Sequence, residues 1–328
     1  MISVICPIYN EEKYIAKCID SILKQDYPHD EMEILFVDGM SQDNTRAIIY
    51  EYVKKHNIIR LLNNPKKIVP CAMNIGIRKS HGDIIIRIDA HATYATNYIS
   101  SLIRNLKKLN CENIGAPCVT DVINKTKKSL AIKEVLSNRF GVGNSKFRIG
   151  VNKLIETDTV PFGCWPKETF ARFGLFDERL KRNQDIELNK RIIKGGGHIF
   201  ITPETSSIYY AREDFYALAK NNYNNGKWNI LTVYYTNSFR SLSLRHFIPL
   251  LFLLSITIPL ILSPIYWPLA LLSLISLTAY ITLICIISLK ISIAKKCSFY
   301  YLHMAFTVLH ISYGWGSFCG IIKTIYKK

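Results

Sequence analysis

Blocks of apolar residues alternate with polar, helix-like blocks over the first ninety residues. Short β-branched runs are typical of buried strands, and they occupy 2–10, 32–39, 58–64 and 83–91. Apolar positions recur at helical spacing between the first two runs, which predicts a helix there. Two further helices are predicted within 41–57 and, after a turn, within 66–82. This alternation predicts an α/β fold with an open, largely parallel sheet.

Polar side chains follow the first, second and fourth of these strands: Tyr9, Asn10 and Glu11, then Asp38, then Asp89 and His91. The carboxyl ends of parallel strands meet at one edge of a sheet, and ligands bind outside that edge. We therefore expect these side chains to converge on one site.

The fourth strand ends on the stretch Asp89-Ala90-His91, which has two interpretations. Aspartate is a common turn former, so the strand end has an ordinary structural explanation. A carboxylate and an imidazole two residues apart also suit a divalent metal. No glycine-rich dinucleotide fingerprint follows the first strand, and no phosphate-binding P-loop occurs in the chain. A metal at Asp89 and His91 would neutralise a bound diphosphate instead.

Two further residues have both a structural and a functional interpretation. Asp185 stands near the start of a helix predicted to end at Gly195 and Gly196, where an acid stabilises the helix dipole or acts in catalysis. Trp165, in the stretch PFGCWP, packs in a loop or stacks on a bound sugar, and we favour packing.

From residue 247 the sequence becomes strongly apolar. The uncharged stretches 247–265 and 267–289 predict two membrane spans, of which the first is interrupted by prolines. The stretch 299–322 predicts either a third membrane helix or a helix at the membrane interface, and we favour the interfacial helix. Basic residues lie at one side of the first pair and predict that the catalytic part faces the cytoplasm of a plasma (inner) membrane: Arg240, Arg245, Lys290, Lys295 and Lys296. If the third stretch crossed, Lys323, Lys327 and Lys328 would lie outside, against this rule.

The formal net charge of +17 favours anionic partners, and residues 104–153 are the most basic part of the chain. Beside a membrane segment, anionic headgroups or a pyrophosphate-linked lipid are as plausible as a solvated surface. We expect no nucleic-acid partner, because no nucleic-acid-binding motif is present. The 9 cysteines include no CxxC pair and suggest reduced, buried thiols. The amino terminus does not resemble a signal peptide.

Four motifs in order resemble the family 2 glycosyltransferases, whose nucleotide-sugar-binding fold is called GT-A. They are the P-x-Y-N-E turn at 7–11, the strand EILFVDG with Asp38, the N-x-G helix at 74–76 leading to Asp89-Ala90-His91, and NQDIELNKR at 183–191. The Asp89-Ala90-His91 variant resembles the succinoglycan-type exopolysaccharide branch, and so does the HxSYGxGxxxG pattern at 310–320. The chain departs from the family at Gly39 and Gln184, where acids are common, and at His91, which replaces the last acid.

The resemblance implies roles for individual residues. It implies Asp185 as catalytic base, Asp89 and His91 as ligands of Mn²⁺ or Mg²⁺, and a donor site formed by Pro7, Tyr9, Glu11, Asp38, Asn74, Asp89 and Trp228. The imidazole of His91 favours Mn²⁺ over Mg²⁺ at this site. Trp228 lies in NNGKW, a degraded form of the Q-x-x-R-W motif of processive synthases, with Asn224 and Lys227 replacing Gln and Arg.

The implied organisation is a GT-A domain over 1–240 and a membrane region over 241–328. The implied activity is inverting transfer from a nucleotide-sugar, most simply a UDP-sugar, to a lipid-linked saccharide in surface polysaccharide synthesis. Two alternatives are a processive polysaccharide synthase, which needs an intact Q-x-x-R-W and more spans, and a non-catalytic nucleotide-sugar-binding membrane scaffold. A nucleotidyltransferase is less favoured, because the chain opens with PIYNEE where a glycine-rich basic loop is expected.

Overall fold

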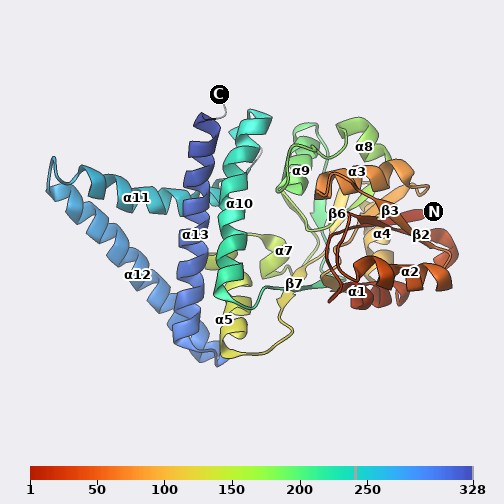
Figure 1. The fold of residues 1–328 in the computed structure, drawn as a ribbon, viewed down its shortest axis with the longest axis horizontal. Coiled ribbons are helices and arrows are strands. Elements are labelled where there is room, and N and C mark those ends of the chain that lie inside the picture. The colour runs from red at the N-terminus through yellow and green to blue at the C-terminus, as the bar shows by residue number, and fades with distance from the viewer. Residues whose placement is uncertain (240–241, 327–328) are drawn as a thin grey trace. The chain divides into compact units, whose positions relative to one another are not determined.

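The computed structural model describes residues 1–239 and 242–326, and the chain forms two compact units (Figure 1). The first unit consists of residues 1–119 and 146–210, and the second of 120–145 and the described residues from 211 onward. The predicted flanking charges Arg240, Lys327 and Lys328 lie outside the described residues. The predicted boundary at residue 240 remains a prediction.

The first unit is an α/β unit. Its strands are β1 (Ile2–Ile8), β2 (Met32–Asp38), β3 (Ile59–Asn63), β4 (Ile84–Arg87), β5 (Ala92–Tyr94), β6 (Asn113–Gly115), β8 (Ile155–Glu156), β9 (Cys164–Pro166), β10 (Ile199–Ile201) and β11 (Ser207–Tyr210), with β7 (Cys118–Asp121) at the boundary. Its helices are α1 (Ile15–Leu23), a 3-10 turn (His29–Glu31), α2 (Thr45–Lys55), α3 (Val69–Lys79), α4 (Tyr98–Leu109), α7 (Lys146–Ile149), α8 (Glu168–Phe173) and α9 (Gln184–Lys194).

An eight-stranded sheet of order β3-β2-β1-β4-β9-β6-β10-β8 forms the centre of this unit. Strands β3, β2, β1 and β4 are parallel, as the sequence predicted, whereas β9 runs antiparallel to β4 and β6. Because β2, β1 and β4 are neighbours, their carboxyl ends share one edge, and Ile8 pairs with Asp38 there. A second, three-stranded sheet has the order β5-β11-β7.

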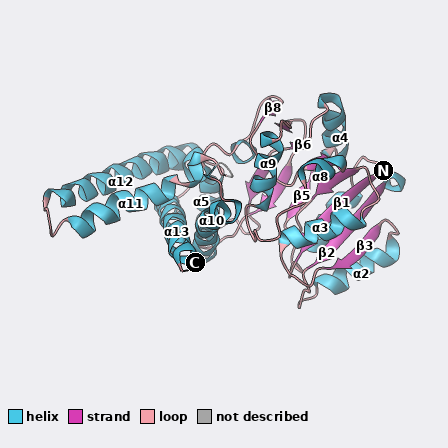
Figure 2. Ribbon diagram, turned by 90° about the horizontal axis from the view of Figure 1, so that it is seen from above, coloured by secondary structure: helices cyan, strands magenta, loops and turns pink. Residues whose placement is uncertain are grey.

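Helices cover the large sheet (Figure 2), and each of its faces has its own apolar core. Successive strand residues point to opposite faces. Val4 and Cys6 of β1 therefore join a core with residues of α1 and α4, while Ile5 between them joins a core with residues of α3 and α9. The sheet is thus buried on both sides, as continuous apolar runs in parallel strands require.

The second unit is helical. It contains α5 (Lys127–Leu136), α6 (Arg139–Val142), α10 (Phe215–Thr236), a 3-10 turn (Leu244–His246), α11 (Ile248–Leu262), α12 (Pro268–Lys295) and α13 (Phe299–Ile325). Within the described residues, two helices are long and apolar enough to cross a membrane: α12, whose most apolar 18 residues have a mean hydropathy of 2.4, and α13, for which the value is 1.2. The helix α11 is apolar but has only 15 residues.

Helices α10 and α13 lie side by side, with their backbones in close contact at glycines (Figures 1 and 2). A Cβ atom placed on Gly226 of α10 would overlap the carbonyl oxygen of Tyr313, and one placed on Gly316 of α13 would overlap that of Tyr223. A Cβ on Gly320 would lie 2.9 Å from the carbonyl oxygen of Lys227. Only glycine permits this spacing between the helix backbones.

Replacing Gly226 with alanine is expected to destabilise the protein. In an unobstructed helix interior this change stabilises by about 0.5–1 kcal/mol, because alanine has the higher helix propensity. Here the added methyl group would meet the α13 backbone, so the substitution should destabilise the protein instead of stabilising it. The measurement is the thermal midpoint of the detergent-purified protein, with exposed Lys220→Ala on the same helix as control. A midpoint equal to or above that of the unsubstituted protein would refute the close contact.

Candidate active site

The loops after β1 and β2 are tied together by reciprocal hydrogen bonds. The Asn10 backbone N–H donates to Ser41 Oγ at 2.9 Å, and the Gln42 N–H donates back to Asn10 Oδ1 at 2.9 Å. The Glu11 N–H donates to Thr45 Oγ1 at 2.7 Å. Asn10 has a φ of 54°, a left-handed conformation that asparagine tolerates better than most residues. The polar residues of these two predicted strand ends are therefore brought together.

Asp38 is completely buried at the end of β2 and is neutralised by Arg46. The guanidinium of Arg46 donates to Asp38 Oδ2 at 2.5 Å, and the Ser41 hydroxyl donates to Oδ1 at 2.6 Å. The hydrogen bond to Asp38 raises the pKa of Arg46. Arg46 also donates to Asn63 Oδ1 at 3.0 Å, linking the ends of β2 and β3. Asp38 thus organises this edge of the sheet, and its contact with a nucleobase remains a prediction.

Gly39 has limited space for a side chain. A Cβ there would lie 3.3 Å from the carbonyl oxygen of Ile8 and 3.3 Å from the Tyr9 ring, closer than an ordinary contact. Tyr9 itself is 44% exposed, so its ring is available at this edge. A side chain at position 39 would therefore require the Tyr9 ring or the strand backbone to shift by a few tenths of an ångström.

Asp89, just after β4, forms a two-point ion pair with Arg87. Arg87 Nε donates to Asp89 Oδ1 at 3.0 Å, and its terminal nitrogen donates to Oδ2 at 3.3 Å. The Asp89 backbone N–H donates to the Tyr94 hydroxyl at 2.7 Å, which fixes the strand end. Arg87 is buried, whereas Asp89 is partly accessible. The arginine balances the charge of Asp89, and the Asp89 carboxylate remains accessible to solvent.

Asp185 belongs to the same charge cluster. Burial acts to lower the pKa of Arg87, but the negative charges of Asp89 and Asp185 outweigh it, and the pKa of Arg87 is raised. Asp185 lies in the first turn of α9, is partly exposed, and accepts a hydrogen bond from the Ile186 N–H at 2.9 Å. The charges of Asp185 and Asp89 thus both act on one buried arginine, and only Asp89 also accepts hydrogen bonds from it.

His91 is oriented by Glu11. Its Nδ1 lies 3.3 Å from Glu11 Oε1, and its ring makes an edge contact with Tyr209 at 5.2 Å between centroids. A carboxylate paired to one imidazole nitrogen is the usual arrangement around a metal-ligating histidine. The ends of β1 and β4 therefore meet at this pair, as the sequence predicted for polar residues on neighbouring parallel strands.

The donor set at this edge fits a divalent cation that is shared with a diphosphate. Within residues 1–239 and 242–326, no group of three or more histidine, cysteine, aspartate or glutamate side chains is arranged to hold a metal. Asp89 and His91 supply one carboxylate and one imidazole, both partly accessible. Cations such as Mg²⁺ are commonly bound through one or two carboxylates with substrate phosphates completing the shell, and imidazole suits Mn²⁺.

Asn74 has a positioning role in the structure. Its amide nitrogen donates to the Phe176 carbonyl at 2.9 Å and to Glu178 Oε1 at 3.1 Å, and its oxygen accepts from the Phe176 N–H at 3.0 Å. These bonds join α3 to the segment before α9. Hydrogen bonds from Lys66, then Asn74, lower the pKa of Glu178 to about 2. Direct contact of Asn74 with a donor remains a prediction.

The remaining predicted residues have distinct outcomes. Trp165 is buried in β9 against Phe170 and Phe176, which confirms packing over sugar stacking. Pro7 lies near the end of β1, opposite Val37. Trp228 belongs to the helical unit, where its ring stacks with Tyr235, and its role at the donor site remains a prediction.

Arg87 is the site residue that the sequence interpretation missed. Its signal is visible in IIIRID, where a single charged residue interrupts an apolar strand. A buried charge requires a partner, and the nearest acid in the chain is Asp89. That reasoning would have predicted the ion pair, although not the proximity of Asp185.

Solved structures with the same architecture show the fold. A mannosyltransferase of Pyrobaculum calidifontis, solved with GDP-Man and Mn²⁺, superposes with a TM-score of 0.61 at 16% identity, over 100% of this chain and 87% of that one. Staphylococcus aureus TarS 1–349, solved with UDP-GlcNAc, superposes with a TM-score of 0.52 at 16% identity, over 98% of this chain and 92% of that one. The fold is the GT-A fold of glycosyltransferases.

Sequence comparison identifies the family. The model of glycosyl transferase family 2 matches residues 3–174, and the chain belongs to this family. Over 64% of this chain and 67% of the relative, it is 33% identical to a Methanococcus voltae dolichyl N-acetyl-alpha-D-glucosaminyl phosphate 3-beta-D-2,3-diacetamido-2,3-dideoxy-beta-D-glucuronosyltransferase. It is 28% identical to the succinoglycan biosynthesis protein ExoA of Rhizobium meliloti (strain 1021), over 64% of this chain and 63% of ExoA.

Proposed function

We propose that the protein is a membrane-anchored, inverting, metal-dependent glycosyltransferase. It transfers a sugar from a nucleotide-sugar, most simply a UDP-sugar, to a lipid-linked saccharide during surface polysaccharide synthesis. The observation that carries the proposal is the ion pair of Asp89 with buried Arg87, on which the charge of Asp185 also acts, in a chain of glycosyl transferase family 2 with a GT-A sheet.

Asp185 is the catalytic base in this proposal. Its carboxylate accepts the proton of the acceptor hydroxyl while that oxygen attacks the anomeric carbon and the nucleoside diphosphate leaves. Asp185 lies in the first turn of α9 and is partly exposed, so an acceptor hydroxyl can reach its carboxylate. One direct displacement inverts the anomeric centre, so an α-linked donor gives a β-linked product.

The strand-end loops bind the donor. Asp38 and Tyr9 lie near the nucleobase, with Pro7, Glu11 and Asn74 shaping the surrounding loops. Asp89 and His91 would hold Mn²⁺ or Mg²⁺, which when bound stabilises charge on the departing diphosphate. Arg87 holds the Asp89 carboxylate in place through two hydrogen bonds, and Glu11 orients the His91 imidazole.

Two observations support the lipid-linked acceptor and the membrane location. The Methanococcus relative is named for a dolichyl-phosphate-linked sugar, and ExoA is named for succinoglycan biosynthesis. Helices α12 and α13 are long and apolar enough to cross a membrane. A plasma-membrane protein with its catalytic unit in the cytoplasm agrees with the basic residues Lys290, Lys295 and Lys296 after the apolar part of α12.

The test is donor cleavage by the detergent-purified full chain. UDP-, GDP- and dTDP-sugars are supplied with Mn²⁺, with Mg²⁺ or with chelator, and release of the nucleoside diphosphate is measured. We expect release from one donor class, dependent on the cation and lost in Asp89→Ala. Asp83→Asn is the matched control, because Asp83 is an exposed acid beside the opposite end of the same strand. Failure of every nucleotide to bind would exclude the proposal.

A further inference from the structure

The α11–α12 hairpin of the helical unit carries an extended exposed apolar surface. No acidic, basic or histidine residue occurs between Phe247 and Leu289. Ile261 is 73% exposed, Ile265 at the turn is 85% exposed and Trp267 is 69% exposed. Isolated exposed apolar residues are ordinary, but an uncharged hairpin that exposes them along both arms needs an apolar environment.

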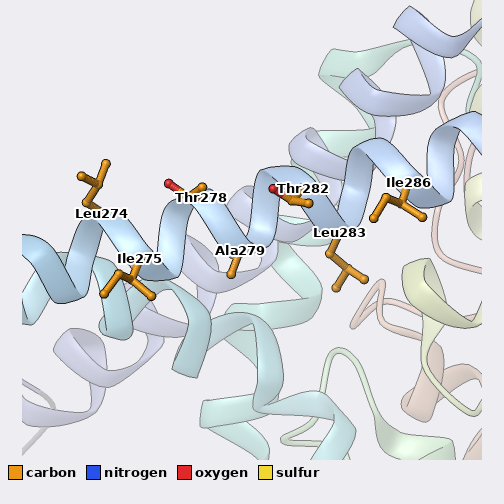
Figure 3. Close-up of a pocket in the computed structure, with 7 residues that line it drawn as sticks. All are labelled: Leu274, Ile275, Thr278, Ala279, Thr282, Leu283 and Ile286. Carbon is orange, nitrogen blue, oxygen red and sulfur yellow. The ribbon is translucent and has the colours of Figure 1, made fainter.

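The α12 arm exposes apolar residues along its length. Figure 3 shows Leu274, Ile275, Ala279, Leu283 and Ile286 projecting from this helix, with two threonines between them. They line a shallow, mostly apolar groove. Such a surface matches lipid acyl chains, because it presents no charge and almost no polar atoms to them.

Helix α13 has a different environment although its length also suits a membrane span. It packs against α10 from Tyr301, beside Phe215, to Gly320, beside Lys227 and Ile230. The glycine contacts leave no room for lipid between the two helices.

The α10 partner is too polar for hydrocarbon. It carries two lysines and five asparagines: Lys220, Lys227, Asn221, Asn222, Asn224, Asn225 and Asn229. Charged side chains are rare and costly in the bilayer core. Because α13 lies along α10, placing α13 across a bilayer would bring this polar helix with it.

The returning end of α12 is held by parts of the chain that belong outside the hydrocarbon. Ile284 and Ile287 share a core with Ala131 of α5, Leu218 of α10 and Leu302 of α13. Pro249 and Leu253 of α11 lie against Gly314 of α13, and the Tyr280 hydroxyl of α12 lies 3.1 Å from His310 Nδ1 of α13. The arms beyond these contacts are 254–262 of α11 and 268–279 of α12, about 14 and 18 Å long at 1.5 Å per residue. These lengths reach about half of the way through a hydrocarbon core of about 30 Å.

We propose that the α11–α12 hairpin is the element that enters the lipid bilayer, and that α13 remains with α10 outside the hydrocarbon core. Both ends of the hairpin and the end of α13 then lie on the same side of the membrane. This inference rests on the membrane association in the proposed function. It assigns that association to lipid acyl chains around one hairpin, where the sequence alone left the third helix as a possible span.

The test is cysteine labelling in sealed membrane vesicles of both orientations. The background replaces the partly exposed Cys285, Cys297 and Cys319 by serine, since the other six cysteines are buried. Single cysteines are then placed at Leu244, Ile265 and Tyr326, which have matched exposures of 87%, 85% and 85%. A membrane-impermeant maleimide is the probe.

We expect the cysteines at 244 and 326 to react in the same vesicle orientation, and the one at 265 not to react in that orientation before detergent is added. If the cysteine at 326 reacted only in the opposite vesicle orientation, α13 would cross the membrane and the proposal would be overturned. Reaction of 265 together with 244 would show that the hairpin is not inserted, with the same consequence. Labelling does not depend on catalysis, so a failed donor assay leaves this result interpretable.

A matched pair of lysine substitutions gives a second measurement. Ile275→Lys on the hairpin and Ile311→Lys on α13 change residues that are 63% and 47% exposed. We expect the first to lower the fraction of protein that stays in alkali-washed membranes and the second to leave it unchanged. Equal loss from both variants would place α13 in the hydrocarbon and contradict the proposal.

Discussion

Asp185→Asn is expected to lower the rate of donor turnover by about 10²–10⁴-fold, the range for removal of a general base. Asparagine keeps the size of the side chain and its acceptor oxygen for the Ile186 N–H, but it cannot take the acceptor proton. The Kd for the nucleoside diphosphate should change little, because the loss concerns proton transfer. The measurements are the turnover rate with the donor found by the screen and a nucleotide-binding titration on the same preparation.

Two controls separate chemistry from structure in this experiment. Lys194→Ala changes an exposed residue at the end of the same helix and should retain the full rate. The thermal midpoint of Asp185→Asn should stay close to that of the unsubstituted protein, since Asp185 is partly exposed. Full turnover by Asp185→Asn would exclude its role as base, whereas equal loss of nucleotide binding and turnover would indicate a role in binding the donor.

Arg87→Met is expected to destabilise the protein by about 1.5–3 kcal/mol, the range for a lost hydrogen bond to a charged group, because the Asp89 carboxylate that remains is partly accessible to water. Methionine preserves much of the aliphatic volume, so the expected loss comes from charge. Asp89 would lose two hydrogen bonds, and Asp185 would lose the nearby positive charge. The measurement is the free energy of unfolding of the detergent-purified protein, or its thermal midpoint where unfolding is irreversible.

A second arginine provides the comparison for Arg87→Met. Arg60 also donates to a buried acid, Glu33, at 3.2 Å, but its side chain is 40% exposed, so water can replace it. Arg60→Met should cost about 1 kcal/mol or less. The double variant Arg87→Met/Asp89→Asn should recover part of the loss, because it removes a carboxylate together with its counter-charge. Equal losses in the free energy of unfolding for Arg87→Met and Arg60→Met would refute the idea that burial of the arginine determines the stability of the ion pair.

The sequence was sufficient for the parts of the fold with strong local patterns. The strands β1 to β4 are apolar runs, so their order along the chain and the meeting of their carboxyl ends could be predicted. The helix α9 carries a clear start near Asp185 and a glycine end. The strand β9, in contrast, has three residues, too few for a visible periodicity, and its antiparallel pairing depends on distant strands.

Pairing between side chains was less predictable than the position of each strand end. Asp38 was expected at the sheet edge, but its neutralisation by Arg46 requires α2 to bring the arginine back over β2. Asn74 was expected at the donor site, and the structure uses its amide to hold the Phe176 backbone, over a hundred residues away in the chain. Such contacts depend on tertiary packing that no local pattern encodes.

The reciprocal bonding between the loops after β1 and β2 limits how this enzyme can change its specificity. Each loop supplies hydrogen-bond partners to the backbone of the other, through Asn10, Ser41 and Thr45. A substitution in one loop therefore alters the support of the other, and the effects of changes in both should not be additive. Under the proposed function, a new donor preference along this edge would have to evolve by paired replacements, with the two loops inherited as one unit.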